Sequence, residues 1–550
     1  MTSILPGIYP VMKSTIQSAL PPAGGDNGTM NDSSRASVPS HSPVPHVFVT
    51  RGDLTHMACD AWMVPTDRTL SVRSYWTKDN PALLEAIKKI SDDAFFAGET
   101  HAVAVETWDE AGPIPVFTAV PYFGFDDASE FADIIDSFAE TAAHAVSESG
   151  RAGSRPFPLL AMPVIGSGGG GGAEVLGDLI RVVLEGAEFA AARRLIDIVI
   201  VVRNAAQMGL AQRIRRENQH SQWTGLSPEV KKAAEELSTD CVSGNIVPFL
   251  GAGISISAGA PSWPTLVSQL SAEVADQLTN VEKASLAAKG PLDQAEILKN
   301  LYPSPEEFNT AVTELVKKAA YGLAPTLIAN LPLNQAITLN YDELFEIASE
   351  DAGNTCAVIP GTENPEASRW LLKMHGNVSD TSTIVLTRSD YLGFDANRNV
   401  LAALVKASLV TKRLVFIGFG LGDDHFHQIL HDVREVSPES IARRAIALTL
   451  ADDSLEQKAW KDKITLQPMA PHGTDTVTAG RILEIFLDYL LMLSTDSREY
   501  LLDPAFESQL TDPERRLKDL ISSIHALNHE ADDPSIAAAS AAIGRFGTLN

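Results

Sequence analysis

Four short segments in the second half of the chain combine glycines with polar side chains. Gly251, Ala252, Gly253 and Ser255 follow one apolar run, and Gly418, Gly420 and Asp423 follow another. Between these two segments lie Asn340 with Asp342, and then His375. Glycine lets a backbone approach a diphosphate, and a helix that starts after the turn offers free N–H donors. Histidine accepts a proton from a ribose hydroxyl near neutral pH. Together the segments predict a site that binds a dinucleotide.

Each segment also has a simpler structural interpretation. The two glycine segments could be tight strand–helix turns without a ligand, and Asn340 or Asp342 could cap a helix. His375 alone could be a satisfied structural residue. The joint interpretation is favoured because three of the segments follow predicted strands and the His375 segment follows a short apolar stretch, in one order, within one region. Ligands bind at the carboxyl ends of strands in open parallel sheets, so the four segments are expected around one crevice.

Such a crevice requires a parallel sheet. We predict strands at residues 246–250, 336–339, 384–387, 414–418 and 445–450, with helices in the gaps and an all-helical insertion at about 263–330. This alternation is typical of a Rossmann-like, doubly wound α/β domain, which we place at 229–475. Residues 476–550 are expected to form a C-terminal helical region, which could mediate assembly or belong to the core.

The first half of the chain shows the same alternation. Strands are predicted at 47–49, 61–64, 102–106, 115–120, 158–165 and 196–202, and helices at 81–90, 129–148 and 173–191. We therefore expect an α/β/α sandwich at 46–215, joined to the second domain by a polar linker at 216–228. Residues 1–45 are rich in proline, serine and glycine and are expected to be disordered.

Composition excludes several other classes of protein. Lys+Arg 43 against Asp+Glu 70 gives a net charge of −27, which argues against binding a nucleic-acid backbone. Cys59, Cys241 and Cys356 form no C-x-x-C pair, so neither a structural zinc site nor a disulfide framework is expected. His425 and His427 lack a third ligand nearby in the sequence, so we predict no metal. No apolar run is long enough for a bilayer and no secretory signal is evident, so a cytoplasmic location is expected.

The four segments resemble the motifs of the sirtuin family. The run from Gly251 to Pro261 is very similar to the family signature. Thr338-Leu339-Asn340-Tyr341-Asp342 resembles its T-Q-N-I-D segment, His375-Gly376 its catalytic H-G, and Gly418-Phe419-Gly420-Leu421 its ribose-binding G-T-S-L. The resemblance covers about residues 243–450. It implies a fold that binds NAD⁺ and cleaves the nicotinamide–ribose bond.

The resemblance also implies roles for individual residues. Asn340 would orient the ribose and the attacking water, Asp342 would hold the nicotinamide end, and His375 would act as base. The residues expected to hold the rest of NAD⁺ are Gly251, Ala252, Gly253, Ser255, Trp263, Gly418, Gly420 and Asp423. Positioning in a crevice of restricted water would supply most of the catalysis.

Departures from the family pattern favour NAD⁺ hydrolysis over protein deacylation. The chain lacks the cysteines of the deacylases' zinc module, and Ser262-Trp263-Pro264 replaces their D-F-R. Ser389-Asp390-Tyr391 and the Gly-x-Gly-x-x-Asp ending in Asp423 are similar to the bacterial branch, which contains NAD-depleting effectors of anti-phage defence of the Thoeris type. We therefore expect an NAD⁺ hydrolase, forming a homo-oligomer. The alternatives are a zinc-free NAD-dependent deacylase and a non-catalytic nucleotide-binding module.

The first domain resembles a macro domain. Residues 49–55, followed by Asp60-Ala61-Trp62-Met63-Val64, are similar to the opening of that family, and residues 160–168 to its diphosphate loop. The resemblance implies that Asp53 contacts an adenine and that Gly166, Ser167, Gly168, Gly169 and Gly170 cradle a diphosphate. A sensor of an ADP-ribose-like nucleotide that activates the NAD⁺ hydrolase is thus predicted. A floppy glycine loop, and a turn role for Asp53, are the alternatives.

Overall fold

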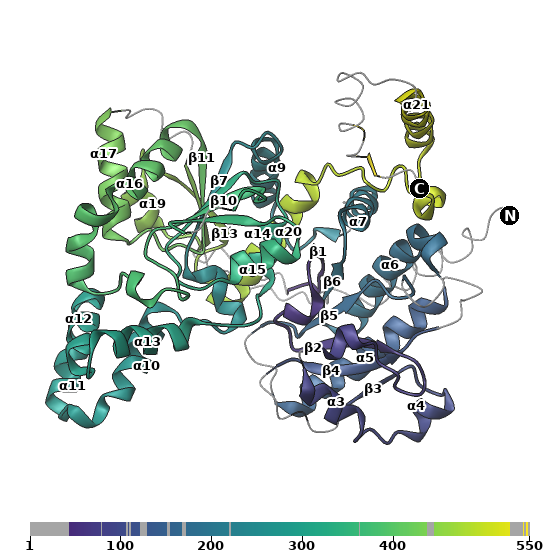
Figure 1. The fold of residues 1–550 in the computed structure, drawn as a ribbon, viewed down its shortest axis with the longest axis horizontal. Helices are drawn as coiled ribbons and strands as arrows, with labels where there is room; N and C mark the ends of the chain where they lie inside the picture. The colour runs from purple at the N-terminus through teal and green to yellow at the C-terminus, as the bar shows by residue number, and fades with distance from the viewer. Residues whose placement is uncertain are drawn as a thin grey trace, which may run out of the picture.

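A computed structural model describes residues 43–550, apart from residues 79, 106–107, 109–111, 122–128, 151–154, 168–171, 219–221, 362–363, 437–444, 529–542, 544–545 and 548–550. The predicted disorder of residues 1–45 therefore falls almost wholly outside the described residues, as do Gly168, Gly169 and Gly170. The described chain is built around two sheets of mostly parallel strands, which lie side by side in Figure 1.

The first sheet has the strand order β1-β6-β5-β2-β4-β3. Its strands are β1 (Val47–Arg51), β2 (Ala61–Thr66), β3 (Ala102–Ala104), β4 (Ile114–Ala119), β5 (Leu159–Pro163) and β6 (Asp197–Val202). Neighbouring strands are parallel except β3 against β4. The helices around it include α3 (Pro81–Ile87), α5 (Glu130–Ser149), α6 (Leu176–Arg194) and α7 (Ala205–Glu217). All six predicted strands are present within a few residues of their expected positions.

The second sheet has seven parallel strands in the order β13-β12-β11-β7-β8-β10-β9. They are β7 (Ile246–Leu250), β8 (Gln335–Thr338), β9 (Cys356–Ile359), β10 (Arg369–Lys373), β11 (Arg413–Ile417), β12 (Ile446–Ala451) and β13 (Thr465–Ala470). From β7 the chain passes to β8, then to β9 at the edge, and then back to β10 between them. It next forms β11 on the other side of β7 and winds outward through β12 to β13. The crevice between β7 and β11 is therefore the topological switch point, where such sheets bind ligands.

The helices of this half lie between and beyond its strands. They are α9 (Pro228–Val242), α15 (Leu344–Asp351), α16 (Arg388–Thr411), α17 (Asp424–Val436), α19 (Ser454–Trp460), α20 (Thr476–Ser494) and α21 (Asp512–Asn528). The predicted helical insertion is confirmed as α10 (Trp263–Glu273), α11 (Asn280–Ala287), α12 (Pro291–Leu301), α13 (Pro305–Val316) and α14 (Leu323–Ala329). Helices α10 to α13 surround a small core of their own and project from the sheet in Figure 1.

The predicted strand at 384–387 is wrong. Ile384 and Leu386 lie in the segment before α16 and are buried against the insertion helices, so their apolar character reflects packing rather than a strand. The strand that leads to His375 is β10, whose sequence Arg369-Trp370-Leu371-Leu372-Lys373 begins and ends on charged residues. The short apolar stretch before His375 is visible in the sequence but is not among the predicted strands, because charged residues bound it, yet Arg369 and Lys373 are both buried. Strands β9 and β13 were also not predicted.

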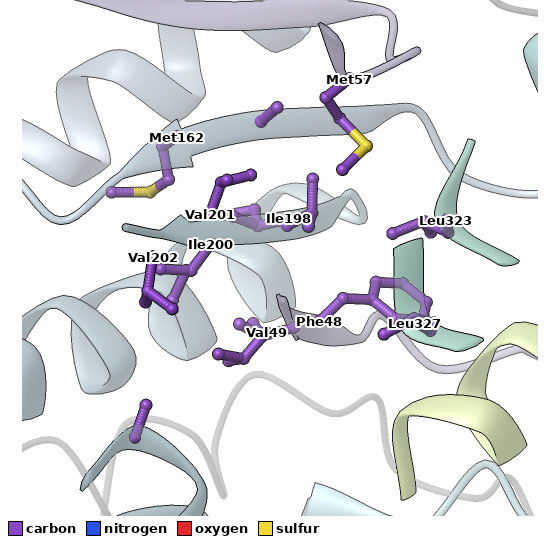
Figure 2. Close-up of a cluster of buried hydrophobic side chains, with 14 of the residues drawn as sticks. Phe48, Val49, Met57, Met162, Ile198, Ile200, Val201, Val202, Leu323 and Leu327 are labelled. Atoms are coloured by element: carbon purple, nitrogen blue, oxygen red, sulfur yellow. The ribbon is translucent and has the colours of Figure 1, made fainter. Parts of the chain in front are cut away.

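One hydrophobic core connects the two sheets. Helix α14, the last helix of the insertion before β8, packs on β1 of the first sheet. Figure 2 shows Leu323 and Leu327 of α14 beside Phe48 of β1, and all three belong to a single buried cluster. Polar contacts add to this packing, because the Asn330 side chain donates to the Arg51 carbonyl at 2.8 Å. The edge strand β1 is thus covered by the other half of the chain.

Helix α20 also joins the two halves, through buried charges. Asp488 on this helix is fully buried and accepts from the Arg215 guanidinium at 2.9 and 2.6 Å and contacts the His46 ring at 2.8 Å. Two turns earlier, Arg481 forms a bidentate pair with the buried Asp197 of β6, at 2.7 Å for both bonds. α20 therefore belongs to the core. Among the described residues, no helix is long and apolar enough to cross a membrane.

We expect Asp488→Ala to lower the free energy of unfolding by about 3–5 kcal/mol, because it leaves the Arg215 charge buried without a partner. Urea unfolding followed by tryptophan fluorescence measures this loss, and Trp223, whose ring lies 4.6 Å from the Arg215 guanidinium, reports on the site. The matched control is Asp432→Ala, which breaks a half-exposed pair with Lys406 and should cost under about 1 kcal/mol. Equal losses in the two variants would contradict the role assigned to the buried pair.

Candidate active site

A cavity of about 540 Å³ opens at the carboxyl ends of β11, β7, β8 and β10, at the switch point of the second sheet. Its lining combines backbone from the two glycine turns, side chains from the loops after β8 and β10, and side chains from the insertion. The predicted residues that line it are Gly251, Ala252, Ser255, Trp263, Asn340, Asp342, His375, Gly418, Gly420 and Asp423. The predicted convergence of the four segments on one crevice is therefore present in the structure.

The two glycine turns pack backbone against backbone. The Gly251 amide donates to the Ile417 carbonyl at 3.0 Å, and the Gly253 amide donates to the Gly418 carbonyl at 2.9 Å. A Cβ atom on Gly251 would lie 2.5 Å from the Gly418 oxygen, and one on Gly253 would lie 2.7 Å from the Gly418 Cα. Gly253 consequently serves this contact and does not line the cavity. The segment after Gly251 is the 3₁₀ helix η3 (Ala252–Ala258) rather than the predicted α-helix.

A chain of hydrogen bonds fixes Asn340 and Asp342. The Ser255 hydroxyl donates to Asp342 Oδ2 at 3.0 Å. Its oxygen therefore accepts from Asn340 Nδ2 at 3.3 Å, and the same Nδ2 donates to the Gly251 carbonyl at 3.1 Å. Both neighbours of the Asn340 amide nitrogen are acceptors, so the orientation of the amide is determined. No described residue donates to its Oδ1, which is left for a ligand.

Asp342 combines two roles. Its Oδ1 accepts from the Leu344 amide at 3.2 Å, beside the start of α15, although the N-cap residue of this helix is Glu343 and not Asp342. Its other oxygen faces Ser255 at the cavity wall. Burial raises the pKa of Asp342, although the charge of Lys373 opposes this shift. Asp342 is thus both a structural and a cavity-lining residue.

Lys373 holds the loop that carries Asn340 and Asp342. It is the last residue of β10 and only 1% exposed, and its ammonium group donates to the carbonyls of Tyr341 and Asp342 at 3.3 and 2.5 Å. A contact with the Glu346 carboxylate at 2.6 Å compensates the charge. A buried lysine needs such partners, and here they tie β10 to the loop after β8.

His375 lies deep in the cavity wall, 3% exposed. Burial lowers the pKa of His375 to about 4, with the Asp423 carboxylate opposing the shift, so the ring is neutral at neutral pH. Its Nε2 atom lies 3.3 Å from Nδ1 of His425 and 3.9 Å from Oδ2 of Asp423. The Tyr391 hydroxyl donates to the same Asp423 oxygen at 2.7 Å. Tyr391 and Asp423 thus line the cavity next to His375.

His425 corrects one detail of the sequence analysis. We expected no metal at His425 and His427 because no third ligand is near them in the sequence, and His427 does stack on Trp460. The ligand atoms of His375, Asp423 and His425 lie within 4.8 Å of one another and could hold a metal ion. Spacing along the chain could not reveal this group, because His375 comes from a different loop.

The insertion closes the other side of the cavity. Trp263, the first residue of α10, lines the cavity, and its indole Nε1 is buried without a hydrogen-bond partner. Arg388, at the start of α16, is the one arginine or lysine among the described lining residues, and Asp293 of α12 pairs with it at 2.9 Å. Asp342, Asp423 and Asp424 line the same cavity, so carboxylates outnumber cations there. Of these groups Arg388 was not predicted.

A second, smaller cavity of about 200 Å³ lies at the carboxyl ends of strands in the first sheet. Gly166 and Ser167 line it, together with Arg73, Trp76 and Arg203, which were not predicted.

Asp53 does not line this cavity. Its carboxylate accepts from the Thr55 amide at 2.9 Å. Burial and the nearby negative charge of Asp53 raise the pKa of Tyr75 to about 12. The Arg203 guanidinium lies over the Tyr75 ring at 4.8 Å, which connects Asp53 to the cavity rim. The proposed adenine contact of Asp53 stays a prediction.

Comparison with known proteins finds similarity in the second half of the chain. A family described as a SIR2-like domain matches residues 334–469, which include Asn340, Asp342 and His375. Defense-associated sirtuin 2 of Bacillus subtilis is 29% identical over 231 residues, covering 39% of this chain and 22% of that protein. NAD(+) hydrolase ThsA of Enterococcus faecium is 29% identical over 246 residues, covering 40% and 48%.

NAD(+) hydrolase ThsA of Bacillus cereus (strain MSX-D12) is 26% identical over 274 residues, covering 47% of this chain and 56% of that protein. The chain thus spans between about a fifth and just over half of the length of these relatives. The similarity agrees with the expected sirtuin-like character of the second sheet and its site.

We expect Gly251→Ala to destabilise the protein by about 1–3 kcal/mol or more, because the added methyl group meets backbone atoms that cannot rotate away. Gly420→Ala is the matched control, since a Cβ there meets no atom within 4 Å. Thermal melting of the two variants measures the difference. A Gly251→Ala protein as stable as the Gly420→Ala protein would show that the two turns do not constrain each other.

Proposed function

We propose that this protein is an NAD⁺ hydrolase that cleaves the bond between nicotinamide and ribose. The observation that carries the proposal is the placement of Asn340, Asp342 and His375 around one cavity with two glycine turns. These residue types can bind a ribose, hold a carboxamide and accept a proton. The names of the relatives, which include a defence-associated sirtuin and NAD(+) hydrolases, support the same activity.

The proposed ligand position follows from the charges of the cavity. The NAD⁺ diphosphate lies against the turns that contain Gly251 and Gly418, where the exposed backbone at Ala252 and Gly420 replaces the basic side chains that the described lining mostly lacks. The nicotinamide end points toward Asp342 and Trp263. The unpaired indole N–H of Trp263 is a donor for the carboxamide oxygen, and its ring covers one face of the nicotinamide.

Bond cleavage leaves positive charge on the ribose, and nearby carboxylates stabilise that charge. Asp342 is the nearest candidate, since its buried carboxylate is fixed by Ser255 before any ligand arrives. Groups that are oriented in advance stabilise a transition state without reorganising. The Oδ1 atom of Asn340 holds the ribose or the attacking water, and neutral His375 accepts the proton that this water or a ribose hydroxyl loses.

The biological role that we propose is anti-phage defence, in which the enzyme depletes cellular NAD⁺. Such an activity must stay silent until infection, so it requires a trigger. We propose that the cavity in the first sheet binds an ADP-ribose-like nucleotide and provides that trigger. Arg73 and Arg203 support this proposal, because both line the cavity and neither forms an ion pair with a described carboxylate.

A short segment connects the Asp53 turn to η3 at the wall of the larger cavity. The Tyr321 hydroxyl accepts from the Asp53 amide at 3.1 Å and donates to the Asp53 carbonyl at 3.2 Å. The next residue, Gly322, packs so closely on Ser257 of η3 that a Cβ atom would clash with its hydroxyl. The same 3₁₀ helix carries Ser255, the hydrogen-bond partner of Asn340 and Asp342. A ligand that moves the Asp53 turn would therefore act on the NAD⁺ site through Tyr321 and η3.

The activity is tested by incubating the purified full-length protein with NAD⁺, with and without ADP-ribose, and measuring free nicotinamide. We expect Asn340→Ala and His375→Ala to abolish nicotinamide release while their melting temperatures stay near that of the wild type. Release at wild-type rates from both variants would refute the assignment. Release only when an acylated peptide is added would identify a deacylase instead, and NAD⁺ binding without turnover would identify a silent binding module.

The trigger is tested with the same assay and ADP-ribose derivatives, both linear and cyclic. We expect at least one derivative to raise nicotinamide release, and Asp53→Ala and Arg203→Gln to remove that response. Arg193→Gln, which changes an exposed arginine of α6, is the matched control and should respond as the wild type does. Constant activity with every derivative would contradict the sensor proposal without affecting the hydrolase proposal.

A further inference from the structure

The ring of His425 is held in one orientation behind His375. His425 is the second residue of α17 and is 7% exposed. Its imidazole stacks between Tyr391, at 4.3 Å and an interplanar angle of 10°, and Phe394, at 4.0 Å and 26°. Two flat faces on opposite sides restrict rotation of the ring, so its two nitrogens face fixed neighbours.

Those neighbours determine where the protons lie. His425 Nε2 is 3.0 Å from the backbone carbonyl oxygen of Tyr391, which can only accept, so Nε2 carries the proton. In a neutral imidazole the other nitrogen is then an acceptor. That nitrogen, Nδ1, lies 3.3 Å from Nε2 of His375. The contact is therefore a hydrogen bond in which His375 Nε2–H donates to His425 Nδ1.

We infer that His425 is a positioning residue that places the proton of His375 on Nε2 and leaves Nδ1 as the basic nitrogen. The inference rests on the proposed hydrolase function, because it names the atom that acts as base in that reaction. No described residue forms a hydrogen bond with His375 Nδ1. In the reaction, the O–H bond of a water or ribose hydroxyl breaks, the proton joins Nδ1, and the Nε2–H bond to His425 is kept.

The surroundings also suit the imidazolium that this step produces. Asp423 Oδ2 lies 3.9 Å from His375 Nε2 and stabilises its positive charge, while the Tyr391 hydroxyl keeps that carboxylate in place at 2.7 Å. The arrangement uses a neutral acceptor in the place where a carboxylate orients the histidine of a catalytic triad.

A bound metal ion is the competing explanation for the same cluster. His375 Nε2, His425 Nδ1 and an Asp423 oxygen all face one another, and a bond from His425 Nε2–H to a carbonyl is also usual for metal-bound histidines. We favour the hydrogen bond because it satisfies both ring nitrogens of His425 without any added group. The experiment below separates the two explanations.

Two substitutions of His425 separate its role as a hydrogen-bond acceptor from its role as a stacked ring. His425→Phe keeps a ring between Tyr391 and Phe394 but removes the acceptor for His375. His425→Asn loses the stacked ring but places a carbonyl oxygen near the position of Nδ1. The ring protonation of His375 is read from two-bond ¹⁵N–¹H correlation spectra of the full-length protein with ¹⁵N-labelled histidine, and His375→Gln assigns the signals.

In the wild type we expect His375 to carry its proton on Nε2. In His425→Phe that form should no longer dominate, and kcat for NAD⁺ cleavage should fall at least ten-fold with KM changed less than two-fold. In His425→Asn the Nε2–H form and most of kcat should be retained. A role in packing alone predicts the reverse order, with the phenylalanine variant the more active.

The inference is overturned if wild-type His375 carries its proton on Nδ1, or if His425→Phe retains both the Nε2–H form and wild-type kcat. It is also overturned if elemental analysis finds about one divalent metal ion per chain that His425→Phe loses, because the cluster is then a metal site. If no protein in the series releases nicotinamide but the spectra show the expected protonation, the hydrolase proposal fails and the assigned hydrogen bond stands.

Discussion

The contact between the two glycine turns constrains the rest of the second sheet. β7 and β11 are neighbouring parallel strands, and from them the chain continues toward opposite edges of the sheet. The turns that follow the two strands meet backbone against backbone at Gly251 and Gly418. Because no side chain fits between them, the two turns lie backbone against backbone beside the cavity, where Ala252 and Gly420 are exposed. A dinucleotide can approach such a wall closely, since small residues leave the backbone accessible.

Beside these turns, a series of hydrogen bonds holds the buried polar residues in place. Lys373 fixes the loop that carries Asn340 and Asp342, and Ser255 connects these two side chains to the turn at Gly251. Each group is buried and each donor has an acceptor. Satisfied buried networks are rigid, so the side chains that face the cavity are positioned before a ligand binds.

The two sheets share a core instead of meeting through a loose linker. Trp223, in the stretch that the sequence suggested as a polar linker, is 1% exposed and contacts both Arg215 and Tyr489. Helices α14 and α20, which belong to the second half of the chain, pack on β1 of the first sheet. A structural change in one half must therefore disturb contacts with the other, which is the physical requirement for coupling two sites.

The sequence by itself determined the alternation of strands and helices, the helical insertion, and the four segments that follow strands. These features depend on local patterns, such as the apolar run of Ile246–Leu250 before Gly251, which are visible in any short window. β10 was missed because its ends, Arg369 and Lys373, are charged and are buried only through partners distant in sequence.

Only the tertiary structure decided how the site is completed. His425 comes to His375 from a different strand–helix unit, and its ring orientation depends on stacking between Tyr391 and Phe394 of a third element. The tertiary structure also decided that Gly253 packs against the Gly418 backbone. It placed Asp53 in contact with Tyr321 and not in the lining of the first-sheet cavity. Such contacts join residues from 31 to 268 positions apart, and local sequence patterns do not encode which distant groups meet.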